Sequence, residues 1–88
     1  EIVRMFLQAV NRGEVMLFGH DIKPEMLHPT RVEYIYELNS PTPEIRVYSE
    51  ITTPLAVPEN DTCEIRALSA TLDEQGNIIE VKAHVWPK

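Results

Sequence analysis

The sequence has little of several residue types that functional sites commonly need. It contains one cysteine, Cys63, so it cannot form an internal disulfide, and this favours a reducing, cytoplasmic compartment. Its three glycines are isolated from one another, which excludes a glycine-rich phosphate-binding loop. No apolar run approaches the roughly 20 residues of a membrane-spanning helix. We therefore expect a fold held together by packing, without a membrane segment.

Positive charge is also scarce. Eight lysines and arginines face 14 acidic residues, and the net charge is −6. Because affinity for nucleic acid rests on cations that neutralise phosphates, we expect no nucleic-acid partner, and an acidic membrane would repel the chain. The charge is explained by solubility or by an acidic surface that meets a basic partner.

No catalytic or metal-binding pattern emerges from the titratable residues. His20 and His28 have no standard zinc spacing, and no second cysteine is present to assist them. Cys63 has acidic neighbours in Asp61 and Glu64, which disfavour a reactive thiolate. We therefore expect no cofactor and no metal, and we favour a protein that is not an enzyme.

A chain of 88 residues forms one domain with a thin core. Such a chain buries only roughly 60–65% of the surface that its unfolded form exposes. Association with a second subunit would therefore stabilise it noticeably.

The first third of the chain has helical signals. Apolar residues recur at spacings of three and four over residues 2–10, and Gly13 suits the end of this helix. Residues 14–18 could form a second helix or a buried strand, and we favour a helix. Residues 23–28 indicate one further turn that starts at Pro24 and ends at Pro29.

The rest of the chain alternates with period two, which predicts strands at about 31–38, 44–51, 63–72 and 79–86. Residues 39–43 are expected to form a loop, 54–58 an edge segment or crossing loop, 59–62 a polar turn, and 73–77 a hairpin loop. The predicted fold is α+β, a single domain over residues 1–88. It has an N-terminal helix or helix pair (about 1–29) packed on an antiparallel sheet of about four strands (about 30–88).

The third strand breaks its own alternation. Glu64 and Arg66 mark one face as exposed, yet Leu68 and Leu72 continue the same face. Either a bulge near Ala67 reverses the faces, or a partner covers this half of the strand. In the second case an interface would form, with the residues Tyr48, Leu68, Leu72 and Trp86.

Three segments resemble those of NTF2-like (SnoaL-like) proteins. They are residues 6–14 (FLQAVNRGE), Leu27-His28-Pro29 before Val32, and residues 72–80 around the closing hairpin loop. The resemblance implies helices packed in the concave face of a curved sheet, with dimers formed through the outer face. The family includes isomerases, dehydratases and non-catalytic binding proteins. It also implies a cavity between helices and sheet, lined here by Phe6, Phe18, Tyr34 and Tyr36.

Three functions are compatible with these features. The first is a non-enzymatic interaction or assembly module that forms a homodimer or docks on another protein. The second is a small-molecule binder or enzyme with an NTF2-like cavity. The third is an acidic inhibitor of a basic nucleic-acid-binding protein, which requires the carboxylates to cluster on one face.

Overall fold

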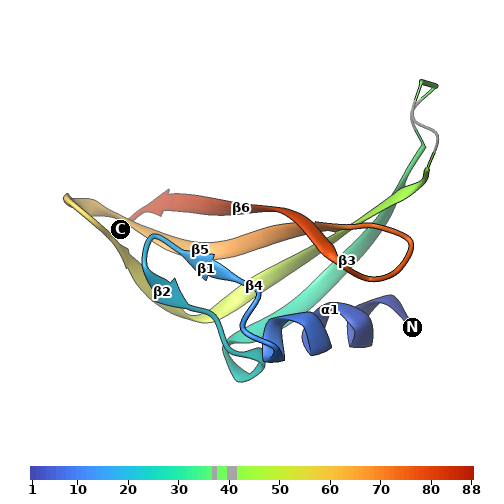
Figure 1. Ribbon diagram of the computed structural model, residues 1–88. Coiled ribbons are helices and arrows are strands. Elements are labelled where there is room, and N and C mark those ends of the chain that lie inside the picture. Colours follow the sequence, from blue (N-terminus) through green and yellow to red (C-terminus); the bar gives the residue numbers. More distant parts are fainter. Residues whose placement is uncertain (37, 40–41) are drawn as a thin grey trace.

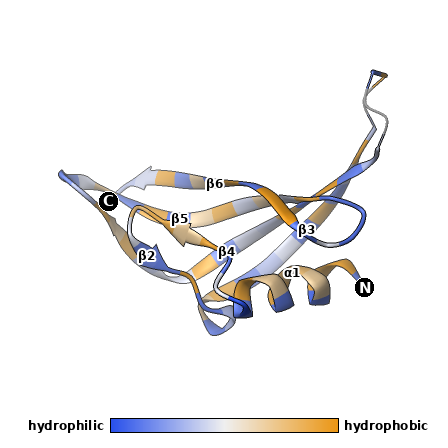
Figure 2. Cartoon of the chain, in the orientation of Figure 1, coloured by the Kyte–Doolittle hydropathy of each residue, from blue (hydrophilic) through white to orange (hydrophobic). Residues whose placement is uncertain are grey.

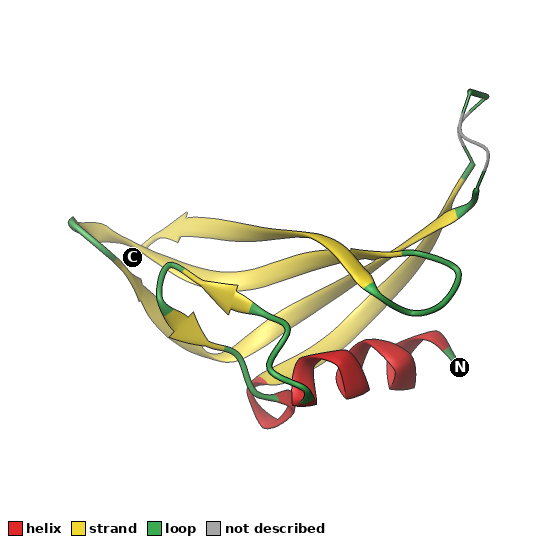
Figure 3. Cartoon of the chain, in the orientation of Figure 1, coloured by secondary structure: helices red, strands yellow, loops and turns green. Residues whose placement is uncertain are grey.

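The computed structural model describes residues 1–36, 38–39 and 42–88. One helix and a small two-stranded hairpin cover the same face of a four-stranded antiparallel sheet (Figures 1 and 3), which confirms the expected α+β class. The strand order of the large sheet is β3-β4-β5-β6. The elements are α1 (Ile2–Asn11), β1 (Met16–Leu17), β2 (His20–Asp21), the 3-10 turn η1 (Pro24–Met26), β3 (Leu27–Ile35), β4 (Glu44–Val57), β5 (Asn60–Leu72) and β6 (Ile78–Pro87).

Helix α1 forms as its amphipathic pattern predicts. The Glu1 carboxylate accepts a hydrogen bond from the backbone N–H of Arg4 at 3.3 Å and caps the helix start. Phe6 and Val10 lie on the stripe that faces the sheet, and both are almost completely buried. Gly13 follows the helix with a φ of +79°, a conformation that favours glycine, and the helix ends there.

The expectation of a second helix over residues 14–18 is wrong, because this segment enters the β1–β2 hairpin. Leu17 pairs with His20, and the two residues between them, Phe18 and Gly19, have φ values of +48° and +85°. Positive φ at both central residues is the geometry of a type I′ hairpin turn. The reversal lets Val15, Leu17 and Ile22 enter the core, while Met16 and Phe18 stay exposed.

The turn that starts at Pro24 is confirmed as η1, but Pro29 does not end it. Strand β3 begins earlier, at Leu27, and runs through Pro29, where the register with β4 shifts. An edge strand tolerates proline because its missing N–H can face away from the neighbouring strand. The predicted end of this strand and the following loop fall partly on Glu37, Ser40 and Pro41, which lie outside the described residues.

Strand β4 is longer than predicted and continues past Pro54 to Val57. Its register with β5 is irregular between Glu50 and Leu55, so Pro54 sits where the regular ladder is interrupted. The predicted polar turn at 59–62 is displaced, since Val57 already pairs with Asn60. The hairpin loop at 73–77, by contrast, is confirmed between β5 and β6.

A β-bulge in β5 resolves the irregular third strand. Ile65 pairs with Val85 and Ala67 with His84, so Arg66 is an extra residue in β5. The insertion reverses the facing of every later side chain. Leu68 and Leu72 consequently point toward α1 with exposed fractions of 0% and 1%.

The core lies in one layer between the sheet and the elements that cover it. Figure 2 shows that hydrophobic and hydrophilic residues alternate along the strands and α1. The chain is extended for its size. Its radius of gyration is 13.4 Å, whereas a compact domain of this length has about 12 Å. Its accessible surface is 5722 Å², against about 5,300 Å² for a typical monomer of this mass.

Candidate interaction surface

The face of the sheet opposite α1, here called the outer face, is left uncovered by the described residues. Directly paired residues share a face, so the register assigns each strand's contribution. Among the described residues, the outer face carries four cationic and five acidic side chains, so it is nearly neutral. These residues are Arg31, Glu33, Glu44, Arg46, Glu50, Glu64, Arg66, Glu80 and Lys82.

Three rings on this face form a row, here called the aromatic strip: Tyr48, His84 and Trp86. The Tyr48 and His84 ring centroids are 6.5 Å apart, and those of His84 and Trp86 are 6.3 Å apart. Both spacings fall within the range of favourable aromatic contacts. Trp86 remains 44% exposed, so the strip presents apolar area to solvent.

The strip is held in place by polar contacts. The Arg31 guanidinium lies 4.2 Å above the Tyr48 ring, and the Tyr48 hydroxyl donates to Glu33 at 2.8 Å. Arg31 and Glu33 also form an ion pair at 3.6 Å. The His84 Nε2 atom lies 3.3 Å from the Ser69 hydroxyl, within hydrogen-bond distance. The Tyr48 and His84 rings therefore have polar partners on β3 and β5, which restricts their rotamers.

Arg46 adds positive charge beside the strip. Hydrogen bonding with the Tyr48 side chain, with smaller contributions from Glu33 and Glu80, raises the pKa of Arg46 above its usual value. Arg46 therefore stays a cation at every accessible pH. The outer face thus combines rings, guanidinium groups and carboxylates, a mixture that protein interfaces favour around their aromatic anchors.

Two shallow hollows adjoin Trp86. One has a volume of about 490 Å³ and is lined by Tyr48, His84, Trp86 and Ala67, among others. The other, of about 360 Å³, lies on the side of Arg66 and Pro54. Because both hollows are open, they suit an inserted side chain better than a small molecule that needs enclosure.

Among the described residues, we find no arrangement of side chains suited to metal binding or nucleophilic catalysis. They contain no cluster of three or more side chains able to hold a metal ion. Cys63 is half-buried, and its sulfur lies 3.7 Å from the Thr62 hydroxyl. His20 is engaged with the carbonyl oxygen of Ala56 at 3.0 Å, where the ring nitrogen must donate. None of these arrangements pairs a nucleophile with a positioned base.

The four residues expected to line a cavity do not meet. Phe6 is fully buried within the packed core, while Phe18 is 56% exposed at the β1–β2 turn. Tyr34 and Tyr36 are exposed at the far end of β3 and just beyond it. None of the four lines any of the three hollows described here.

The four residues expected to form an interface divide between the two faces. Leu68 and Leu72 belong to the core, whereas Tyr48 and Trp86 lie on the outer face. The sequence interpretation overlooked Arg31, which stacks on Tyr48. Strand alternation places both side chains, but only the pairing of β3 with β4 brings them together.

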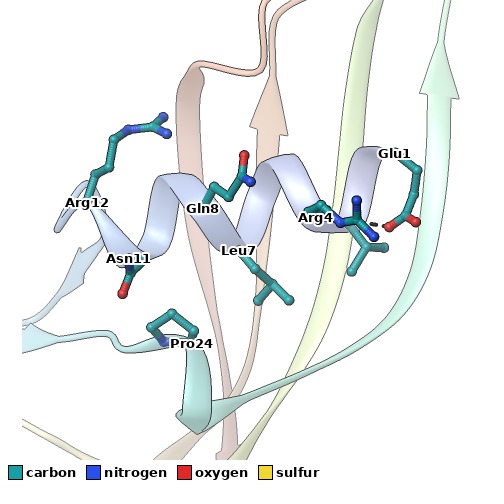
Figure 4. Close-up of a pocket in the computed structure, with 8 residues that line it drawn as sticks. Glu1, Arg4, Leu7, Gln8, Asn11, Arg12 and Pro24 are labelled. Carbon is teal, nitrogen blue, oxygen red and sulfur yellow. Dashed lines mark hydrogen bonds between the residues drawn. The ribbon is translucent and has the colours of Figure 1, made fainter.

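A third hollow, of about 720 Å³, lies along α1 and ends at Pro24 of η1. Leu7 and Asn11 extend from the helix on the side where Pro24 lies, while Arg12 extends on the opposite side (Figure 4). Arg12 is paired with Glu14 at 2.6 Å, which offsets part of its charge. This hollow is a wide, open surface beside an exposed helix and holds no concentrated charge.

Comparison of the chain with protein-family models, curated proteins and solved structures found no match. Within the described part of the chain, no helix has the length and hydropathy to cross a membrane.

Proposed function

We propose that this chain is a small non-enzymatic interaction or assembly module that forms a homodimer. The observation that carries the interaction role is the uncovered outer face with its half-exposed aromatic strip. The homodimer is supported by the thin, extended shape of the chain. Aromatic residues flanked by arginine are the side chains that dominate binding energy at protein interfaces.

The thin, extended shape supports self-association. One covering layer over a four-stranded sheet leaves more accessible surface than a typical monomer of this mass has. Burial against a second copy would remove part of that surface and stabilise the folded state by mass action.

The outer face suits a narrow partner segment better than another flat sheet. Closing two such faces on each other would remove rows of carboxylates and guanidinium groups from water, and this desolvation offsets much of the gain. A protein segment seated on the aromatic strip would leave the outlying charges solvated. We therefore assign the aromatic strip to a different protein and look elsewhere for the contact between two copies.

The two alternative functions have less support. A cavity binder needs an enclosed, partly polar space under the helix, and Phe6 and Val10 fill that region with apolar contacts. An acidic mimic of nucleic acid needs carboxylates gathered on one face. On the outer face they instead interleave with Arg31, Arg46, Arg66 and Lys82.

Light scattering across a concentration series tests the homodimer. We expect a mass of twice 10.1 kDa at high concentration that falls toward 10.1 kDa on dilution. A mass of 10.1 kDa at every concentration would remove the homodimer from the proposal.

A further inference from the structure

The two edges of the large sheet are protected to different degrees. On the β3 edge, Pro29 lacks an N–H and the register shifts between Pro29 and Arg31. Helix α1 packs against β3 and η1, near the start of that edge. Proline, bulges and covering elements are the devices that prevent an edge strand from pairing with another chain.

The β6 edge has few of these devices. After an extra residue at Ile79, β6 runs regularly from Glu80 to Pro87, and its only proline is the last residue. Its extensive contacts are with β5 alone, and Figure 1 shows no element beyond it on the other side. Val85 and Trp86 are each more than two-fifths exposed. A long, regular edge with exposed apolar side chains is a template for strand pairing.

We infer that β6 pairs antiparallel with β6 of a second copy, about a two-fold axis at Ala83, so that two sheets join into one of eight strands. This inference rests on the proposed homodimer and specifies its interface. The axis is perpendicular to the sheet, because only then does each side chain keep its face.

The position of the axis follows from the side chains that it brings together. With Ala83 opposite its copy, Val81 of each chain lies opposite Val85 of the other chain, so this pair occurs twice in the dimer. Both valines lie on the inner face, which is the face that α1 covers. On the outer face Lys82 lies opposite His84, and Glu80 opposite Trp86. Cross-strand apolar pairs are favourable, and no like formal charges at neutral pH stand directly opposite each other.

Neighbouring axes are less favourable. An axis at Lys82 would place two lysines directly opposite each other, which is destabilising. An axis at His84 would bring Pro87 into the ladder, where its missing N–H removes a hydrogen bond. An axis at Val81 would require pairing through the irregular residue Ile79. Ala83 is therefore the centre that uses the whole regular stretch.

The charge of the chain favours the same edge. Two copies of net charge −6 repel each other wherever acidic residues predominate. Strand β6 carries one acidic residue, Glu80, and one lysine, Lys82, so contact along it adds no acidic excess.

Cross-linking with cysteine tests the axis. In a Cys63→Ser background, Ala83→Cys places the two new thiols opposite each other, where cross-strand Cβ atoms lie about 4.5–5.5 Å apart. Mild oxidation or a short bis-maleimide should then convert most of the protein into a covalent dimer. Ile79→Cys is the matched control. Its native side chain is 51% exposed, but four positions from the axis the two copies would be about 27 Å apart.

Light scattering under reducing conditions separates the possible outcomes. A dimer in which Ala83→Cys cross-links and Ile79→Cys does not supports the inference. A dimer in which Ala83→Cys fails to cross-link, or in which Ile79→Cys cross-links equally, overturns the β6 interface and leaves the proposed homodimer standing. A monomer in the Cys63→Ser background and in the native chain overturns both. If only the Ala83→Cys variant is monomeric, the cross-linking test is replaced by a comparison of Val85→Glu with Ile79→Glu. Loss of the dimer in Val85→Glu but not in Ile79→Glu supports the β6 interface. Retention of the dimer in both variants overturns it.

Discussion

Asp73 organises the hairpin loop between β5 and β6. Its Oδ1 atom accepts hydrogen bonds from the backbone N–H groups of Gln75 and Asn77, each at 2.9 Å, and its Oδ2 atom accepts from the Asn77 side chain at 3.2 Å. These hydrogen bonds lower the pKa of Asp73 below its ordinary value of 3.8, and the bond from the Asn77 backbone contributes most. The ionised carboxylate therefore contributes to the stability of the loop.

The sign of the shift sets the pH at which this contribution disappears. Because the pKa is lower in the folded state, the contribution is fully present above about pH 4 and is lost as the pH falls through the folded value. We expect Asp73→Asn to have a lower urea midpoint than the native chain at pH 6, and the difference to narrow at pH 3. Glu74→Gln, which removes the same charge from the same loop, is the control. A difference that does not change with pH would contradict this account.

Among the elements, strand β5 depends most on a single inserted residue. Arg66 is the extra residue of the bulge, and its side chain forms an ion pair with Glu64 at 2.6 Å. The side chain is exposed, whereas the backbone position decides which face the following residues occupy. Mutations can therefore test the effect of the inserted backbone position and the effect of the Arg66 side chain separately.

Arg66→Ala should change the free energy of unfolding by no more than about 1 kcal/mol, because the Arg66 side chain is 52% exposed and ion pairs at the surface contribute little. Deletion of Arg66 should abolish cooperative folding. It would turn either Ile65 or the set that includes Leu68 and Leu72 away from the core, and each large side chain lost from a core costs about 2–5 kcal/mol. Urea unfolding followed by circular dichroism measures both variants. A cooperative transition near the native midpoint in the deletion variant would show that β5 can fold without the bulge.

At the scale of the molecule, a thin core makes stability depend on association. If the folded chain is a dimer and the unfolded chain is not, the unfolding midpoint rises with protein concentration. A hundred-fold increase should raise the thermal midpoint by on the order of 5 °C for a domain of this size. The oxidised Ala83→Cys dimer should show no such dependence. An unchanged midpoint for the native chain over the same range would indicate that folding and association are uncoupled.

An edge-to-edge dimer would also keep both outer faces on one side. The aromatic strips of the two copies would then lie on one continuous sheet, each with Trp86 on the strand next to the new interface. A partner with two binding segments could occupy both strips at once, and the effective concentration of the second segment would raise its apparent affinity.

Several features could be predicted from local patterns alone. The stripe of α1 and the alternation of β4 and β6 depend only on neighbours along the chain, so the α+β class and the four strands were accessible. The placement of Tyr48 and Trp86 on the faces that carry the charged residues of their strands followed from the same alternation. Residues 14–18 are too short for periodicity to separate helix from strand, and the Phe18-Gly19 turn decided the outcome there.

Other features depended on contacts between distant segments. The bulge at Arg66 sends Leu68 and Leu72 to the core, and the pairing of β3 with β4 stacks Arg31 on Tyr48. The order of the strands makes β3 and β6 the two edges of the sheet, and Pro29 with its register shift protects β3. Alternation specifies which residues of a strand share a face, but the register and strand order specify which face is buried and which neighbours meet. Only the packing of the whole chain sets those two properties, because they depend on residues far apart in the sequence.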